Sequence, residues 1–198
     1  MPLPGVNHKE AYMSSDKNKE QLIHDIVERE LIMFLATPNE GGPSACQTRP
    51  QSFRLMRWMN HSTHDAATLE SYLNDLKAAE AQGRNFMIEK YARMDNRLPP
   101  LSTSPLLDEI TDAESAFLHE ASARYPHAIT GNGDTAFRNY CRCELETLSE
   151  RTRELYAEEV RRAQKEGRNL AEERYDNLWK RLGEGSLAAY DAKLAAGA

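Results

Sequence analysis

Two stretches decide the fold, ESYLNDLKAAEAQGRNFMIEKY at residues 70–91 and ELYAEEVRRAQKEGRNLAEERY at residues 154–175. The glutamate, tyrosine and Gly-Arg-Asn positions of the first stretch recur in the second, each 84 residues later. Extended without gaps, the same offset aligns residues 22–98 with residues 106–182 and gives 17 identities in 77 positions. Self-similarity at a fixed period is the signature of a repeated structural unit. The sequence therefore predicts a tandem duplication of a unit of 84 residues.

Each half of the chain carries apolar residues at the spacing of amphipathic helices, bounded by loops that contain Pro and Gly. The predicted helices span 18–36, 50–60, 65–82 and 84–95 in the first half and 106–123, 134–143, 145–165 and 168–182 in the second. No stretch shows the sustained alternation of a β-strand. The predicted fold class is all-α, a helical bundle with four helices in each unit.

The two units are expected to share one core across a pseudo-twofold axis, because a unit of this size hides only about 60% of its unfolded surface. The predicted organisation is a flexible N-terminal tail at 1–17, repeat 1 at 18–101, repeat 2 at 102–185 and a C-terminal tail at 186–198. The tails have no counterpart in the repeat. They are expected to be mobile, or to lie against the outside of the bundle or against a second subunit, as in a homodimer.

Composition and charge exclude several classes of protein. The chain has 198 residues and a net charge of −6, which argues against a nucleic-acid partner, since that needs a basic surface to neutralise phosphates. No run of 18 apolar residues is present, so no membrane span is expected. The N-terminus lacks the apolar core of a secretion signal. Three cysteines give no disulfide framework, which favours a reducing cytoplasm.

Glu30 is the sharpest anomaly, because apolar residues occupy the helix positions one turn before and one turn after it. A carboxylate in an apolar stripe is costly unless it is paired. Glu114 repeats the anomaly 84 residues later. One interpretation pairs each glutamate with an arginine of its own half, Arg54 or Arg138. A second places both glutamates at a shared cavity near the pseudo-axis, and a third leaves them on the surface.

In the cavity interpretation, Glu30 and Glu114 are the candidate catalytic residues. The candidate substrate-binding residues are the repeated polar side chains Arg54, Arg138, Tyr72, Tyr156, Asn85, Asn169, Glu89 and Glu173. Guanidinium groups suit bidentate capture of a carboxylate, and a tyrosine hydroxyl beside a buried glutamate can donate a proton. Each also has a structural alternative: an internal ion pair for the arginines, core packing for the tyrosines, and helix caps or surface pairs for the asparagines and glutamates.

Metal and redox motifs are weak. His61 and His64 have the i,i+3 spacing that can hold a metal on one helical turn, but their repeat counterparts are leucines. The Glu-x-x-His signature of carboxylate-bridged metal sites is missing from the sequence. Cys141-Arg-Cys143 is not a C-x-x-C redox pair. No metal site and no cofactor is predicted.

Three segments, LIHDIVERELIMF, ESYLNDLKAAEAQGRNFMIEKYARM and FRNYCRCELETLSERTRELY, resemble the bacterial family of unknown function DUF4125. The similarity covers most of residues 20–182, and the stretch from the first Gly-Arg-Asn motif to EKYARM is its most specific part. The resemblance implies a helical, cytoplasmic bacterial protein without an established activity. Arg29 and the segment TRPQSFR at 48–54 depart from the family's pattern.

Three functions remain open at the level of sequence. The first is a small-molecule enzyme or binding protein with a cavity between the repeats, lined by carboxylates and arginines, for an anionic or amino-acid-like ligand. Buried carboxylates have raised pKa values and can act as general acids or bases, so such an enzyme would be a non-redox lyase, cyclase or isomerase. Differences between the halves, Met56 against Tyr140 and Arg57 against Cys141, would match an asymmetric substrate. The alternatives are an all-α scaffold module that forms oligomers and a carboxylate-ligated metal protein.

Overall fold

The computed structural model describes residues 8–39, 42, 44 and 46–197, with side chains from residue 18 onward, so the first seven residues of the predicted N-terminal tail lie outside it. The described residues contain nine α-helices and no strand, which confirms the all-α class. The helices are α1 His8–Leu35, α2 Pro50–His61, α3 Ala66–Ala81, α4 Phe86–Met94, α5 Leu106–Arg124, α6 Thr135–Leu145, α7 Glu150–Glu166, α8 Leu170–Arg181 and α9 Leu187–Ala195.

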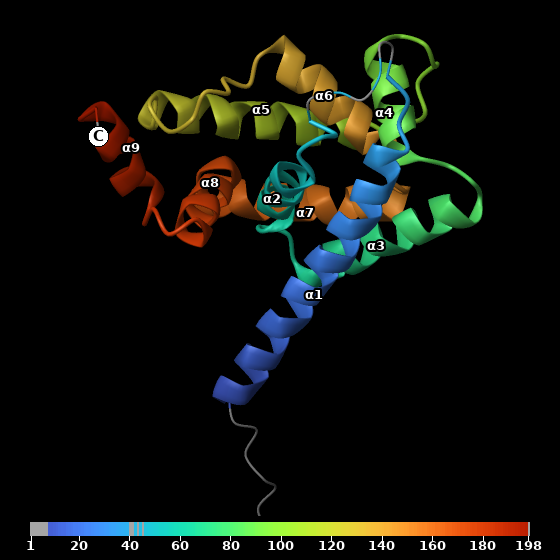
Figure 1. The fold of residues 1–198 in the computed structure, drawn as a ribbon. Helices are drawn as coiled ribbons and strands as arrows, with labels where there is room; N and C mark the ends of the chain where they lie inside the picture. Colours follow the sequence, from blue (N-terminus) through green and yellow to red (C-terminus); the bar gives the residue numbers. More distant parts are fainter. Residues whose placement is uncertain (1–7, 40–41, 43, 45, 198) are drawn as a thin grey trace, which may run out of the picture.

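Two sets of four helices pack in the same way. In the first half α1 contacts α2, α3 and α4, and in the second half α5 contacts α6, α7 and α8. Between the halves α3 packs against α7, α2 against α8 and α4 against α6, so exchanging the halves maps these contacts onto one another. Figure 1 shows the two sets interleaved in one bundle. The contacts have the pattern that a pseudo-twofold axis requires, while the duplication itself stays a prediction.

The first turns of α3 and α7 are each held by a carboxylate of the opposite half. Asp75 accepts hydrogen bonds from the backbone N–H of Ser149 at 2.9 Å and from the hydroxyl of Thr152 at 2.6 Å. Its counterpart Glu159 accepts from the hydroxyl of Thr68 at 2.6 Å and from the backbone N–H of the α3 N-cap residue at 2.7 Å. Each half therefore caps a helix of the other, which fixes the register between α3 and α7.

The Gly-Arg-Asn motifs link α3 to α4 and α7 to α8, as predicted. Gly83 and Gly167 both have φ of +67°, the left-handed conformation that favours glycine after a helix. Asn85 caps α4 by accepting from two backbone N–H groups at 2.9 and 3.0 Å, and Asn169 caps α8 by accepting from one at 3.0 Å. Their amide nitrogens donate to backbone carbonyls of α1 and α5 at 2.8 and 2.9 Å, which anchors α4 and α8 on these helices.

Two helices begin five or more residues away from their predicted start, and the other starts differ by two residues at most. α1 begins at His8, ten residues before the predicted start at 18, and its first part projects beyond the bundle (Figure 1). α7 begins at Glu150 rather than at 145, because Ser149 forms its N-cap and accepts a hydrogen bond from the backbone N–H of Thr152. A serine N-cap satisfies one of the unpaired donors at a helix start and so marks the boundary.

The predicted C-terminal tail forms a further helix, α9, and lies against the bundle. Its Tyr190 stacks on Trp179 of α8, with ring centroids 3.8 Å apart. Asp176 accepts a hydrogen bond from the backbone N–H of Leu187 at 2.8 Å, and Asp191 accepts from two backbone N–H groups of the loop after α5. The start and the middle of α9 are thus held by contacts with the second half.

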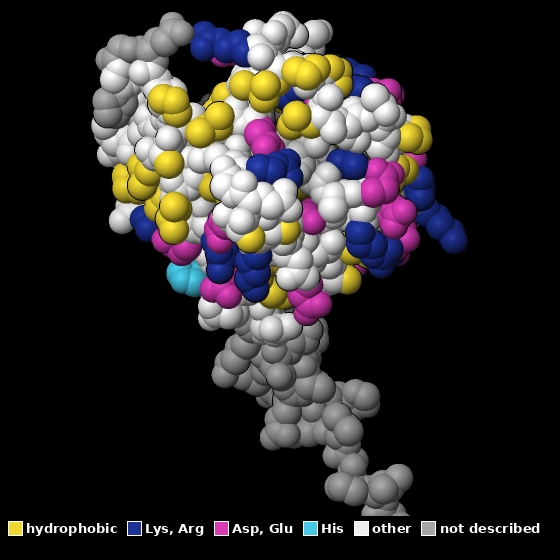
Figure 2. Space-filling model, turned by 90° about the vertical axis from the view of Figure 1, so that its right-hand side faces the viewer, with side chains coloured by type: hydrophobic (Ala, Val, Ile, Leu, Met, Phe, Trp, Pro, Cys, Tyr) yellow, Lys and Arg dark blue, Asp and Glu magenta, His cyan; other side chains and the backbone are white. Residues whose placement is uncertain are grey.

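The surface carries charges of both signs side by side on the face shown in Figure 2. Surface ion pairs of the fold include Arg84 with Glu89 at 2.8 Å and Arg161 with Glu109 at 2.5 Å. Exposed pairs of this kind contribute about 1 kcal/mol or less to stability. None of the described helices combines the length and the apolar run that crossing a membrane requires.

Candidate functional site

A pocket of about 640 Å³ is bordered by both halves of the chain. Six pairs of residues related by the 84-residue offset line it, with one member of each pair in each half. The pairs are Phe34 and Leu118, Cys46 and Thr130, Phe53 and Phe137, Met56 and Tyr140, Lys90 and Arg174, and Tyr91 and Tyr175. The pocket therefore lies where the two halves meet, and half of these side chains are aromatic.

Glu30 of α1 is fully buried at the centre of a hydrogen-bond network beside this pocket. Arg57 of α2 pairs with both of its carboxylate oxygens, with Nε 2.8 Å from Oε2. The hydroxyl of Tyr72 donates to Glu30 at 2.7 Å, and Nε2 of His61 lies 3.2 Å from each oxygen. Glu30 lies behind Arg57, which borders the pocket.

Arg57 carries the network across to the second half. Its Nη1 donates to the two carboxylate oxygens of Glu144 of α6 at 3.1 and 3.0 Å. The ammonium group of Lys90 of α4 donates to Glu144 at 2.8 Å and to the hydroxyl of Tyr140 at 3.0 Å. Only 4% of the Arg57 side chain and 2% of the Lys90 side chain are exposed. Negative and positive groups thus alternate along a buried chain that ties α1, α2 and α4 to α6.

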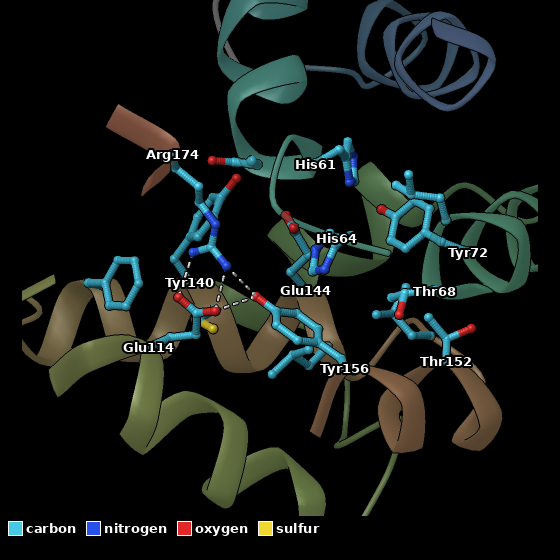
Figure 3. A pocket seen from close by; sticks show the side chains of 16 residues that line it. His61, His64, Thr68, Tyr72, Glu114, Tyr140, Glu144, Thr152, Tyr156 and Arg174 are labelled. Carbon is cyan, nitrogen blue, oxygen red and sulfur yellow. Dashed lines mark hydrogen bonds and ion pairs between the residues drawn. The ribbon is translucent and has the colours of Figure 1, made fainter. Parts of the chain in front are cut away.

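Glu114 of α5 is the centre of a smaller network, drawn in Figure 3. Arg174 of α8 forms a bidentate pair with it at 2.5 and 2.6 Å. The hydroxyl of Tyr156 donates to Glu114 at 2.8 Å, and Nε of Arg174 donates to the hydroxyl of Thr63 of the first half at 3.1 Å. Glu114 is 2% exposed and borders the pocket, whereas Glu30 does not.

The two networks share the glutamate–tyrosine bond but take their arginine from different helices. The counterpart of Arg57 in the second half is Cys141, which cannot pair with a carboxylate, and the cation comes from α8 as Arg174. The counterpart of Arg174 is Lys90, which pairs with Glu144 instead of Glu30. The site is therefore asymmetric although its scaffold repeats.

Neighbouring cations keep the buried carboxylates ionised. Burial opposes ionisation, but the guanidinium and ammonium groups outweigh it. Arg57 and His61 hold the pKa of Glu30 well below its usual range, and Arg174 lowers the pKa of Glu114. Arg57 and Lys90 lower the pKa of Glu144 to about 2. The raised pKa values expected of Glu30 and Glu114 from the sequence are therefore wrong, because their partners are permanent cations.

The two arginines predicted as partners or substrate ligands lie elsewhere. Arg54 donates to Glu28 at 2.6 and 2.8 Å, and Arg138 pairs with Asp112. Neither arginine borders the pocket or reaches Glu30 or Glu114. The pairing of each buried glutamate with Arg54 or Arg138 is a wrong prediction, since the side chains of these arginines run over the outside of the bundle.

The other predicted residues divide into two groups. The hydroxyls of Tyr72 and Tyr156 do lie against the buried glutamates, as the distances above show. Asn85 and Asn169 serve as helix caps. The carboxylates of Glu89 and Glu173 pair with the arginines of the Gly-Arg-Asn motifs, at 2.8 and 2.7 Å, on the surface of the bundle. These asparagines and glutamates do not border the pocket.

Sequence reasoning missed the cations that the site uses, Arg57, Lys90 and Arg174, and the carboxylate of Glu144. A signal existed for Lys90: two buried apolar residues lie three and four positions before it on α4, and the same holds for Arg174 on α8. A search for charged residues within apolar helix stripes, which singled out Glu30, would also have found Lys90 and Arg174. Arg57 and Glu144 have no repeat counterpart of the same type, so the comparison of halves could not find them.

A second cavity, of about 90 Å³, adjoins the pocket and is drawn in Figure 3. Glu114, Tyr140 and Arg174 border both spaces. His61 and His64 line the small cavity. In the part of the chain that the structure describes, no three His, Cys, Asp or Glu side chains come together as a set of metal ligands.

Comparison with known proteins gives one finding. A family model described as protein of unknown function, DUF4125, matches residues 20–192, which is most of the chain. No curated protein and no solved structure matches it. The resemblance seen in the sequence is confirmed by this match.

Proposed function

The chain belongs to the DUF4125 family, and we propose that it binds a small, amino-acid-like molecule in the pocket between its two halves. The observation that supports this is the convergence of six residue pairs, related by the 84-residue offset, on one space of about 640 Å³. Small-molecule sites have volumes of roughly 300–1,000 Å³, mostly apolar walls and a few placed polar groups. The pocket has all three properties.

The charges of the wall favour an anionic group on the ligand. Arg49, Arg57, Lys90 and Arg174 border the pocket, against the single carboxylate of Glu114. Because Arg57, Lys90 and Arg174 already neutralise buried carboxylates, a ligand carboxylate would pair mainly with the guanidinium of Arg49, whose fork suits bidentate capture. The aromatic side chains around it suit an apolar body. A carboxylate joined to an apolar or aromatic group satisfies both parts of the wall.

The protonation states support binding rather than proton transfer by the two repeated glutamates. Glu30 and Glu114 are ionised counter-ions whose pKa values are lowered by arginine, so neither holds a proton to donate near neutral pH. Burial raises the pKa of the hydroxyl of Tyr140, which therefore offers a neutral hydrogen-bond donor to the pocket. We place this binding activity in a reducing cytoplasm, since all three cysteines are free thiols.

Filling the pocket should abolish binding without unfolding the protein. Met56 borders the pocket and is 45% exposed, so Met56→Trp can occupy the space without breaking the core. We expect amino acids and their keto-acid analogues, screened by thermal shift, to include one that stabilises the wild type. At about 100 times its dissociation constant, it should add about 2.7 kcal/mol and raise Tm by roughly 5–10 °C. The Met56→Trp protein should show no shift.

Ile88→Trp is the matched control, because Ile88 of α4 is 39% exposed and lies outside the lining of the pocket. This protein should respond to the ligand as the wild type does. Equal stabilisation of all three proteins, or no stabilisation of the wild type by any member of the screen, would contradict the proposed function.

A further inference from the structure

The small cavity beside the pocket contains two imidazoles with ring nitrogens left open. Nε2 of His61 faces Glu30, and its buried Nδ1 has no hydrogen-bond partner among the described residues. Nδ1 of His64 lies 2.6 Å from Oε2 of Glu159, so Nε2 is the nitrogen of this ring that remains for a ligand. A ring nitrogen that donates to a carboxylate leaves the other nitrogen as an acceptor. In the tautomers in which Nε2 of His61 and Nδ1 of His64 donate to these carboxylates, the other nitrogen of each ring presents a lone pair, and the ring centroids are 6.0 Å apart.

Like the pocket, the small cavity is bordered by both halves of the chain, but the residues at related positions differ in type. His61 and His64 border it from the first half, and their counterparts Leu145 and Leu148 border it from the second. Glu144, also on its wall, has Asn60 as its counterpart. Figure 3 shows the two imidazoles and Glu144 around the same space. The acceptors thus form one site, and no equivalent site exists at the related positions.

The charged side chains in the two linings also differ. The small cavity is lined by two carboxylates, Glu114 and Glu144, and one cation, Arg174. The pocket is lined by four cations and one carboxylate. Burial lowers the pKa of His61, which keeps its ring neutral and its Nδ1 an acceptor. Glu144 and Glu114 are already paired with cations, so the small cavity offers a ligand hydrogen-bond acceptors rather than a net negative charge, and acceptors suit a group rich in N–H donors.

We propose that the small cavity binds the protonated primary amine of the ligand, whose carboxylate and apolar body occupy the pocket. The three N–H donors of an ammonium group match the lone pairs of His61 and His64 and a carboxylate oxygen of Glu144. This proposal rests on the proposed function and narrows its ligand to amino acids and their close analogues with a free amine. It also assigns His61 and His64 as binding residues.

Methylammonium, which carries the amine without the body, tests the cavity alone. In wild-type protein with ¹⁵N-labelled histidine, we expect methylammonium to give a saturable shift of the His61 Nδ1 and His64 Nε2 signals. The exposed His24, His119 and His127 serve as controls in the same spectrum and should not respond. Tetramethylammonium has the same charge but no N–H donor, and acetate has the opposite charge, so neither should shift these signals.

His61→Leu gives the matched variant, since the second half has leucine at this position and still forms its Glu114–Tyr156 bond. We expect methylammonium to bind this protein at least tenfold more weakly, with the signal of His64 as readout. Absence of a saturable shift in the wild type, an equal shift with tetramethylammonium, or unchanged affinity in His61→Leu would overturn the proposal. Because Met56 does not border the small cavity, Met56→Trp should still bind methylammonium, which separates this result from the test of the pocket.

Discussion

Replacing Glu30 by glutamine is expected to lower the free energy of unfolding by about 3 kcal/mol, because it leaves buried partners unpaired. Glu30 is fully buried and receives bonds from Arg57, Tyr72 and His61. A neutral amide of the same shape cannot neutralise the positive charge of the guanidinium, and it accepts hydrogen bonds from fewer donors than a carboxylate does. For a chain of this size, the loss corresponds to a fall in Tm of roughly 6–12 °C. Urea titration of the purified variant measures it.

Glu28→Gln is the matched control for this experiment. Glu28 lies on the same helix, two residues away, and also forms a bidentate pair with an arginine, Arg54. Its side chain is 35% exposed, so water replaces the lost partner, and the expected change is about 1 kcal/mol or less. Similar losses of unfolding free energy in Glu28→Gln and Glu30→Gln would show that burial of Glu30 does not determine how much it contributes to stability.

Arg57→Met is expected to have the largest effect on stability, about 3–5 kcal/mol at pH 7. Arg57 is the only residue that pairs with both Glu30 and Glu144 in the described part of the chain. Without it, the fully buried Glu30 has no permanent cation beside it. We expect the folded variant to take up a proton near Glu30, on the carboxylate itself or on the adjacent His61.

The pH dependence of the stability of Arg57→Met follows from this proton uptake in the folded state, which means a raised pKa near Glu30. A group whose pKa in the folded state is raised above its unfolded value stabilises the fold below the unfolded pKa, and this contribution is lost as pH rises. The stability deficit of Arg57→Met relative to the wild type should therefore grow between about pH 5 and pH 8. Arg54→Met, on the surface of the same helix, should show a small deficit that does not change with pH. A deficit of Arg57→Met that shrinks as pH rises would contradict the account of the network.

Most of the fold could be predicted because helix formation here depends on local signals. Apolar spacing located α1 to α8, and the Gly-Arg-Asn motifs marked two helix connections through a left-handed glycine and an asparagine cap. α9 was missed since its position depends on tertiary contacts. The ring of Tyr190 packs on Trp179, and the carboxylate of Asp176 caps its start. No pattern within nine residues of a tail reveals such partners.

The candidate site could be predicted only in part, because identity between the halves is not a measure of burial. Glu30 and Glu114 were found since a carboxylate in an apolar stripe is visible in one helix. Arg54 and Arg138 were chosen because they repeat, yet they are the surface arginines of α2 and α6. The buried Arg57 is three residues away on α2, and its counterpart is not basic. Residues that make the site asymmetric are those that a comparison of repeats leaves out.

The location of the ligand can be measured directly through the methionines. Met56 and Met59 border the pocket, whereas Met33 and Met87 are buried in the core outside it. In wild-type protein with ¹³C-labelled methionine methyl groups, the stabilising amino acid from the thermal screen should shift the signals of Met56 and Met59 and leave those of Met33 and Met87 in place. Shifts confined to Met33 and Met87, or no shift at Met56 and Met59, would contradict a binding site between the two halves.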